Sequence, residues 1–178
     1  MALNYRRGYV IRFLLIVVCF VAIMANTSSP AFSSQGEKMK KAGSEELAPD
    51  FVLNDLYERK VRLSDYREKV VLLAFSTTWC PSCRRMPPVL NELLSKYGDR
   101  GFEIFNIDIQ ESRKKVRSYA SWNDIKYKVL LDEKATAAKA YNVTGVPSLI
   151  LIDKDGAIIC RQCRSLDRLL ETLLPAVQ

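Results

Sequence analysis

The 178-residue sequence contains no histidine, and this absence excludes several kinds of chemistry. Haem ligation by imidazole, zinc sites of mixed Cys/His type and catalysis by Ser-His or Cys-His pairs all need a residue that this chain lacks. Five cysteines are present, so thiol chemistry remains compatible with the composition. No cofactor is expected. The length suits one domain with a substantial core, preceded by a short leader.

Charge of one sign is not concentrated in the body of the chain. The net charge of +7 falls to +4 when Arg6, Arg7 and Arg12 are set aside, because 27 basic residues become 24 against 20 acidic ones. The remaining lysines and arginines are interspersed with acidic residues, as on an ordinary solvated surface. We therefore expect no nucleic-acid partner.

Residues 1–33 are typical of an export signal or an N-terminal membrane anchor. Basic residues precede the apolar stretch from Phe13 to Ala25, and small polar residues follow it. These 13 apolar residues are short for a bilayer core, which needs about 20. We favour a cleaved signal peptide, with Ala31-Phe32-Ser33 as its recognition site, over a permanent anchor. Either leader places the domain outside the cytoplasm, in the periplasm or on the outer face of the membrane, where disulfides form.

Residues 34–46 are polar and predict a flexible tether, so the folded domain is expected to span 47–178. Within 51–67 the pattern predicts two short strands joined by a turn, and the apolar run 69–76 predicts a strand covered on both faces. The later segments predict a helix at 81–97, a strand at 102–109, a helix at 112–122, a strand at 127–132, a short helix at 134–141, a hairpin of strands at 148–153 and 157–161, and a helix at 166–174. This order predicts an α/β fold with a mixed central sheet, flanking helices and an N-terminal strand pair.

Cys80 and Cys83 stand between the buried strand and the first long helix, and three interpretations of this pair are open. They are a redox pair, half of a metal site, or two buried thiols. Residues three apart in the first turn of a helix meet the Cα separation of about 4.4–6.8 Å that a disulfide requires. A zinc site needs four ligands, and Cys160 and Cys163 lie too far along the chain for the usual spacing. Redox chemistry is the favoured interpretation, and no metal site is expected.

The two thiols of the first pair are predicted to differ. A sulfur at the start of a helix meets unsatisfied backbone N–H groups and the positive end of the helix dipole, which favour thiolate. Pro81 suits the first helical position, where its missing N–H costs nothing. Arg84 and Arg85 add positive charge. We therefore expect Cys80 to be the attacking thiolate and Cys83 the resolving thiol.

The sequence around this pair resembles the TlpA/ResA-type thiol-disulfide oxidoreductases, which are exported thioredoxin-like proteins. The resemblance rests on "FSTTWCPSC", on "GVPSLILIDKDG" and on "APDFVLNDLYERKVRLSDYREKVVLLAF", and it covers roughly residues 47–175. It implies the thioredoxin fold and partners that are protein thiols or disulfides outside the cytoplasm. It also implies a membrane-bound thiol donor and reduction of disulfides in exported proteins, for example during cytochrome c maturation.

The resemblance further implies which residues meet the substrate. In the family the proline that matches Pro147 is cis, lies beside the active cysteines and orients the incoming thiol. Val146 precedes it, while Trp79, Pro81 and Ser82 surround the first cysteine. These five residues are the expected substrate-binding residues.

Two positions depart from the family's pattern. Thioredoxins carry a buried aspartate where this chain has Ala74, and ResA-like reductases carry an acidic residue where it has Met86. Both of the usual proton acceptors for the buried thiol are therefore absent. The polar residues left near the active end are Thr77, Thr78 and Glu103, none of them a convincing acceptor. We expect the proton to pass to water or to the substrate.

Two other functions are compatible with the fold. The segment "APDFVLNDL" also resembles the beginning of peroxiredoxins, which would make the protein a thiol peroxidase. That family's peroxidatic cysteine lies in a Pro-x-x-x-Thr-x-x-Cys setting with an arginine partner, whereas this chain has Trp-Cys-Pro-Ser-Cys. The other alternative is a non-catalytic binding module, in which Cys80→Ser would have no effect.

Cys160 and Cys163 form a second Cys-x-x-Cys pair that is not part of the family's usual pattern. Hairpin pairing around residues 154–156 places residues near 146 opposite residues near 163, at the active end of the sheet. The second pair then lies on the order of 10–15 Å from Cys80. Three interpretations are open: a structural disulfide that ties the last strand to the last helix, an auxiliary redox pair, or free thiols and weak metal ligands. We favour the structural disulfide.

Overall fold

Seven strands form one mixed sheet at the centre of the computed structural model, which describes residues 46–163 and 165–175. They lie in the order β2-β1-β5-β4-β3-β6-β7. Their bounds are β1 Val52–Asp55, β2 Lys60–Arg62, β3 Val70–Ser76, β4 Phe102–Ile109, β5 Lys128–Asp132, β6 Ser148–Ile152 and β7 Ile158–Arg161. The predicted leader (1–33) lies outside the described residues, as does the predicted tether (34–46) except for its last residue.

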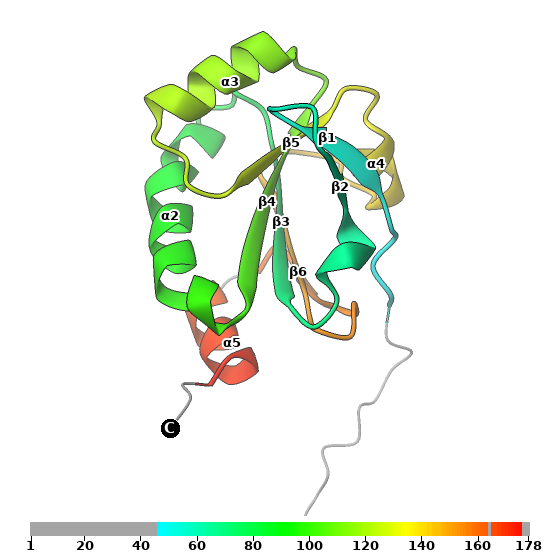
Figure 1. The fold of residues 1–178 in the computed structure, drawn as a ribbon, viewed down its shortest axis with the longest axis vertical. Coiled ribbons are helices and arrows are strands. Elements are labelled where there is room, and N and C mark those ends of the chain that lie inside the picture. Colours follow the sequence, from blue (N-terminus) through cyan, green and yellow to red (C-terminus); the bar gives the residue numbers. More distant parts are fainter. Residues whose placement is uncertain (1–45, 164, 176–178) are drawn as a thin grey trace, which may run out of the picture. The chain divides into compact units, whose positions relative to one another are not determined.

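Helices cover both faces of this sheet (Figure 1). They are η1 Leu63–Tyr66, η2 Cys83–Arg85, α2 Met86–Tyr97, η3 Gly98–Arg100, α3 Arg113–Trp122, α4 Thr136–Ala140 and α5 Leu166–Leu173. Leu90 of α2 and Leu170 of α5 pack against the even-numbered residues of β3. On the opposite face, α4 and η1 pack against the odd-numbered residues. No helix within the described ranges is long and apolar enough to cross a bilayer.

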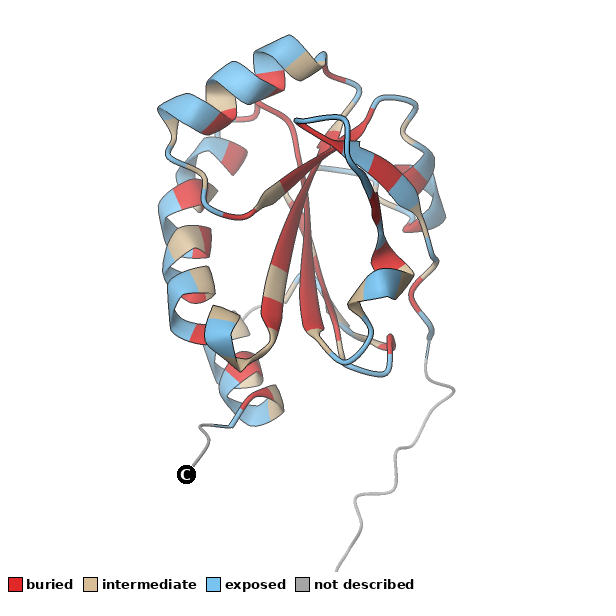
Figure 2. Cartoon of the chain, viewed as in Figure 1, coloured by how far each residue is buried: buried red, intermediate tan, exposed pale blue. Residues whose placement is uncertain are grey.

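β3 is the central strand, and it is confirmed as a strand covered on both faces. It pairs with β4 in parallel and with β6 in antiparallel, so both of its edges are hydrogen-bonded. Every residue of β3 is buried, as the red strands of Figure 2 show. A strand held on all sides has little freedom, and the point at which the chain leaves it is therefore fixed in space.

The predicted α/β architecture is confirmed, including the N-terminal strand pair. β1 pairs with β2 in antiparallel, and β1 also pairs with β5, which joins this pair to the edge of the main sheet. The alternation of strands and helices along the chain follows the sequence pattern from β3 to α5. The mixed sheet arises because β6 runs antiparallel to β3 while β4 runs parallel to it.

The first long helix begins later than predicted. We expected its first position at Pro81, but residues 81 and 82 form a turn, η2 follows, and α2 begins only at Met86. The cause lies at Pro87 and Pro88, which have no N–H to donate to the carbonyls of residues 83 and 84. Prolines are tolerated in the first turn of an α-helix, so α2 begins where its first turn contains both of them.

The predicted hairpin of β6 and β7 is present, with a shifted register. We expected residues near 163 to lie opposite residues near 146. Instead Cys160 pairs with Leu151, and the N–H of Gln162 donates to the carbonyl of Leu149 at 2.8 Å. An irregularity in the pairing next to Leu151 adds to this shift. Cys163 therefore lies beside Leu149 rather than beside the loop that precedes β6.

A buried carboxylate fixes the beginning of α4, the helix that leads to the loop at residues 141–147. Asp132, at the end of β5, is buried, and its two oxygens accept the N–H groups of Thr136 at 2.7 Å and Ala138 at 2.8 Å. Helix N–H groups without an acceptor are costly when they are buried. Asp132 therefore stabilises α4 through its acceptor oxygens.

We predict that Asp132→Ala lowers the free energy of unfolding by about 1–3 kcal/mol, because it leaves two N–H groups without acceptors. Asp132→Asn keeps one acceptor oxygen and should be less destabilising. Urea unfolding followed by circular dichroism measures both variants. A loss below about 0.5 kcal/mol for Asp132→Ala would contradict this role.

Candidate active site

Cys80 and Cys83 lie just beyond the end of β3. Residues 77–79 connect the strand to Cys80, and Cys83 begins η2. Both cysteines are unpaired and buried, with exposed fractions of 6% and 4%. The backbone N–H of Cys83 donates to the sulfur of Cys80 at 3.4 Å. The structure thus brings the predicted pair together in one turn at the end of the central strand.

The surroundings of Cys80 stabilise its thiolate. A hydrogen bond from the Cys83 thiol is the largest cause that lowers the pKa of Cys80. The N–H groups of Cys83 and Ser82 and the charge of Arg85 act in the same direction, against the effect of burial. The sulfur also lies 3.7 Å from the carbonyl oxygen of Val146. Cys80 therefore ionises at a lower pH than an ordinary thiol.

The pKa of Cys83 is shifted in the opposite direction, above its ordinary value. Burial is the main cause that raises the pKa of Cys83 to about 12, and the hydrogen bond to Cys80 and the charge of Asp108 add to it. A backbone hydrogen bond from Thr77 opposes the shift. Cys83 therefore keeps its proton at neutral pH, whereas Cys80 ionises more readily than an ordinary thiol. This inequality allows one thiol to attack first and the other to follow.

A carboxylate from a neighbouring loop holds the segment before Cys80. Glu111, between β4 and α3, accepts the N–H of Thr78 at 2.5 Å and its hydroxyl at 2.7 Å. Lys115 forms an ion pair with the same carboxylate, and Arg84 donates to the carbonyl of Thr78 at 2.9 Å. Burial would raise the pKa of Glu111, but Lys115 and Thr78 hold it below its ordinary value. A charged carboxylate therefore fixes the backbone two residues before Cys80.

Asp108 is a candidate functional residue that sequence reasoning missed. It lies near the end of β4, beside Ser76 at the end of β3, and only 2% of it is exposed. Its Oδ1 atom has no hydrogen-bond partner among the described residues. Burial is the main cause that raises the pKa of Asp108 to about 8, and the charge of Glu111 adds to it. One signal could have found it, since the carboxyl ends of parallel strands meet at the same edge of a sheet.

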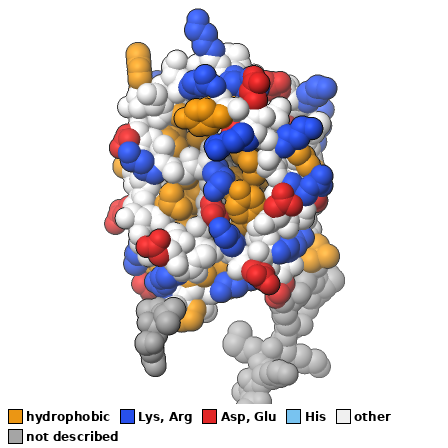
Figure 3. Space-filling view, in the orientation of Figure 1, with side chains coloured by type: hydrophobic (Ala, Val, Ile, Leu, Met, Phe, Trp, Pro, Cys, Tyr) orange, Lys and Arg blue, Asp and Glu red, His pale blue; other side chains and the backbone are white. Residues whose placement is uncertain are grey.

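Glu103, one of the polar residues expected near the active end, lies elsewhere, and that expectation is wrong. It pairs with Val71 at the beginning of β3, away from the cysteines. Its carboxylate forms ion pairs with Lys69 and Lys128, each at 2.7 Å. The face of the molecule in Figure 3 shows such basic side chains among acidic and hydrophobic ones. The rule that locates Asp108 also excludes Glu103, since Glu103 is the second residue of β4 and the cysteines follow the carboxyl end of β3.

The expected substrate-binding residues lie around Cys80. The Val146–Pro147 peptide bond is cis, as the resemblance implies, and both residues line a pocket of about 440 Å³. Trp79 is 61% exposed, and Pro81 and Ser82 are exposed as well. The buried sulfur is thus bordered by accessible apolar side chains and by the Val146 carbonyl. Such a surface suits an extended polypeptide better than a small polar ligand.

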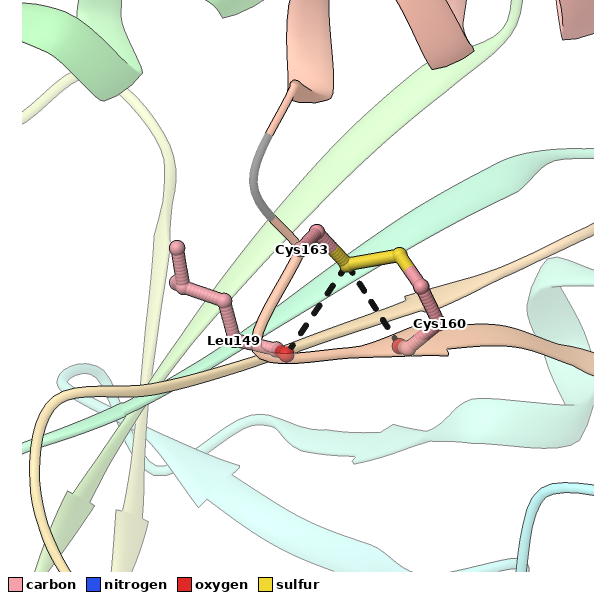
Figure 4. The surroundings of a disulfide bond; sticks show 3 residues. All are labelled: Leu149, Cys160 and Cys163. Carbon is pink, nitrogen blue, oxygen red and sulfur yellow. Dashed lines mark hydrogen bonds between the residues drawn. A yellow bond between two sulfur atoms is a disulfide. The ribbon is translucent and has the colours of Figure 1, made fainter.

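Cys160 and Cys163 are joined by a disulfide, with their Cα atoms 5.6 Å apart (Figure 4). Cys160 lies on β7 opposite Leu151, and Cys163 follows in the turn after the strand. Both are half-buried on the sheet face that α2 and α5 cover. No group of three or more side chains that could hold a metal ion occurs in the part of the chain that the structure describes.

Comparisons with known proteins agree with this arrangement. Residues 44–161 match the AhpC/TSA family. The chain is 39% identical over 128 residues to the thiol-disulfide oxidoreductase ResA of Bacillus cereus, and the aligned region covers 72% of each chain. A candidate thiol:disulfide interchange protein DsbE from Chlorobium tepidum superposes with a TM-score of 0.66 at 28% identity, over 74% of this chain and 94% of that one. The thioredoxin domain of a thiol-disulfide oxidoreductase from Bacteroides vulgatus superposes with a TM-score of 0.68 at 23% identity, over 74% and 98%.

These likenesses place the chain in one class, the thioredoxin-fold thiol-disulfide oxidoreductases. The chain belongs to the AhpC/TSA family and is an enzyme of the TlpA/ResA type within that class. The fold, the family and the enzyme class predicted from the sequence are thereby confirmed.

The opposite pKa shifts predict two well-separated thiol titrations. When the reduced protein is alkylated over a range of pH, Cys80 should react with a midpoint below the ordinary thiol value of about 8.5. Cys83 should stay unmodified until strongly alkaline pH, because burial raises its pKa to about 12. Mass spectrometry of the modified peptides separates these residues from the second pair. Faster alkylation of Cys83 would reverse their roles.

The raised pKa of Asp108 predicts that the attack of Cys83 on a mixed disulfide at Cys80 depends on pH. Cys83 must lose its proton to attack a mixed disulfide at Cys80, and Asp108 can accept that proton only when ionised, above its pKa of about 8. The single-turnover rate of this step should therefore rise as the pH passes through about 8. Asp108→Asn should abolish the rise, while the pH profile of the first attack remains. If the rise persists in Asp108→Asn, another group accepts the proton.

Proposed function

We propose that this protein reduces disulfides in exported proteins outside the cytoplasm, using the two electrons of its Cys80 and Cys83 dithiol. The observation that carries the proposal is the pair of opposite pKa shifts at two unpaired cysteines one turn apart. A thiol that ionises easily attacks first, and a thiol that keeps its proton waits for the mixed disulfide. This order is the one that disulfide reduction by a dithiol requires.

The reaction has two exchange steps. The Cys80 thiolate attacks one sulfur of a substrate disulfide, and the other substrate sulfur leaves as a thiolate that takes up a proton. Cys83 then transfers its proton to ionised Asp108 and attacks the Cys80 sulfur. The first substrate sulfur leaves and is protonated, so the substrate gains two electrons and two protons. The protein is left with a Cys80–Cys83 disulfide.

The substrate is held along the Val146–Pro147 loop. The carbonyl of Val146 faces the Cys80 sulfur, so its other backbone groups can pair with an extended polypeptide in the manner of an added strand. Trp79, exposed beside Cys80, offers an apolar contact that does not depend on sequence. Both features favour unfolded or extended proteins, such as apocytochromes c during their maturation, as substrates.

The oxidised protein needs a source of electrons. In the extracytoplasmic space that the leader pattern indicates, a membrane-bound thiol donor would restore the dithiol after each turnover. The relatives are themselves called thiol-disulfide oxidoreductases, which supports this chemistry without naming the substrate. The N-terminal leader, cleaved or retained as an anchor, accounts for delivery to that side of the membrane.

The proposal predicts that the reduced protein cleaves the disulfides of insulin, measured as turbidity of the released chains with dithiothreitol as electron source. Cys80→Ser should lower the rate to that of dithiothreitol alone, because it lacks the attacking sulfur. Cys83→Ser should retain the first attack and accumulate a mixed disulfide with insulin, detectable by mass. A Cys80→Ser protein with unchanged activity would indicate a non-catalytic module.

The same reduced protein also tests the alternative function, that of a thiol peroxidase. The consumption of hydrogen peroxide by the reduced protein should be slower than insulin reduction, because no arginine among the described residues forms a hydrogen bond to the Cys80 sulfur. Peroxide turnover that exceeds insulin reduction would favour the peroxidase instead.

A further inference from the structure

We propose that Cys160 and Cys163 form a second redox-active couple, which exchanges electrons with Cys80 and Cys83. This inference rests on the proposed function, because it concerns where the electrons of the same dithiol go. It assigns chemistry to a disulfide whose role in the fold is small.

The Cys160–Cys163 disulfide ties together residues that are already close. Backbone hydrogen bonds hold this turn against β6, including the bond from Gln162 to the carbonyl of Leu149 at 2.8 Å. The disulfide joins two residues three positions apart, and both of them precede Leu166, where α5 begins. Closing so short a loop constrains the unfolded chain little. The disulfide therefore ties β7 to the turn that follows it, and its contribution to the stability of the fold is expected to be small.

The site is prepared for the reduced state as well as for the oxidised one. The Cys163 sulfur lies 3.9 Å from the carbonyl oxygen of Leu149 and 3.4 Å from that of Cys160 (Figure 4). A sulfur in a disulfide has no proton, so these contacts become hydrogen bonds only when Cys163 is reduced to a thiol. Both forms of the couple are thereby accommodated without rearrangement of the strand.

The second couple lies on the same face of the sheet as the helix that follows the active site. Cys160 and Cys163 pack in the same hydrophobic cluster as Met86, where α2 begins three residues after Cys83. Arg161 and Gln162, the two residues between the cysteines, line the cavity of about 440 Å³ beside Val146 and Pro147, which none of the four cysteines lines. The Cys80 sulfur faces the carbonyl of Val146. The Cys163 sulfur faces the carbonyl of Leu149. Leu149 follows Val146 by three residues, so the carbonyls of Val146 and Leu149 are at most about 11 Å apart.

The turn that carries the second couple can close this separation. β7 is the last strand of the sheet, so its cysteine-bearing end is bonded on one side only. Gln162 has a left-handed backbone with φ of 53°, a conformation that a non-glycine residue leaves readily when its constraint is released. A movement of residues 161–163 toward the loop at 145–147 would break the bond from Gln162 to the carbonyl of Leu149 and bring the two pairs of sulfurs together, while β3 keeps its pairing.

The exchange is balanced within the protein. The Cys80 thiolate attacks the Cys163 sulfur, the Cys160–Cys163 bond breaks, and Cys160 leaves and takes up a proton. Cys83 then loses its proton and attacks the Cys80 sulfur in the Cys80–Cys163 disulfide. Cys163 leaves, is protonated and donates to the carbonyl beside it. Two electrons have moved from the first pair to the second, with one proton from Cys83 and one from the solvent that took up the Cys80 proton, and the reverse sequence returns them.

The first test follows the oxidation state of the second pair. Reduced thioredoxin, a bulky protein dithiol, is mixed with the oxidised full-length protein, and each cysteine is scored by alkylation and mass spectrometry. Reduction of Cys160 and Cys163 should be at least tenfold faster in the wild type than in Cys80→Ser, with a transfer step independent of protein concentration. Equal rates in the two proteins overturn the proposal, and so does a second pair that stays oxidised after Cys80 and Cys83 are fully reduced.

The second test traps the intermediate. In Cys83→Ser the exchange stops at the mixed disulfide, so non-reducing peptide mapping of the monomer should find Cys80 linked to Cys163. Cys83→Ser/Cys163→Ser is the matched control, and it should lack this crosslink. Absence of the crosslink in a folded Cys83→Ser protein overturns the proposal. If the wild type fails to reduce insulin, the proposed function fails first, which is a separate outcome from insulin reduction with an inert second pair.

Discussion

The position of the nucleophile depends on the carboxylate of Glu111. β3 is fixed by the sheet, but the chain leaves the sheet at Ser76, and no strand pairing guides it to Cys80. Two hydrogen bonds from Thr78 to a charged, buried carboxylate take over that task. Hydrogen bonds to charged groups are roughly twice as strong as neutral ones, so a short loop becomes nearly as well defined as the strand before it. The distance between the Cys80 sulfur and Val146 follows from this anchor.

The two carboxylates at this end of the sheet, Glu111 and Asp108, differ in their protonation. Glu111 has Lys115 and Thr78 as partners and stays ionised, whereas Asp108 has an unpartnered oxygen and holds a proton up to about pH 8. Two neighbouring acids with such different surroundings take different roles. Ala74 and Met86 leave the usual positions for a proton acceptor apolar. Asp108, on the neighbouring strand β4, is an acid whose charge reaches Cys83 and raises the pKa of that thiol.

Hydrophobic periodicity predicted the fold because the strand β3 and the helices around it bury apolar residues at regular spacing. The beginning of α2 was misplaced, since two adjacent prolines, Pro87 and Pro88, override periodicity. Glu103 was expected at the active end and Asp108 was not, although Glu103 begins β4 and Asp108 lies near its carboxyl end. The exact pairing that places Asp108 beside Ser76 is not contained in a single sequence. Spacing and residue type identified Cys80 and Cys83, whereas their electrostatic surroundings came from segments distant in the chain.

The paired prolines also separate the active-site segment from the helix that follows it. The carbonyls of residues 83 and 84 receive no N–H from Pro87 and Pro88, so the hydrogen-bond ladder of α2 does not continue into residues 77–85. A segment with fewer backbone bonds to its neighbour can open locally at a lower free energy than global unfolding. Such an opening exposes the sulfur of Cys83, otherwise buried, to a partner while the core beneath α2 stays intact.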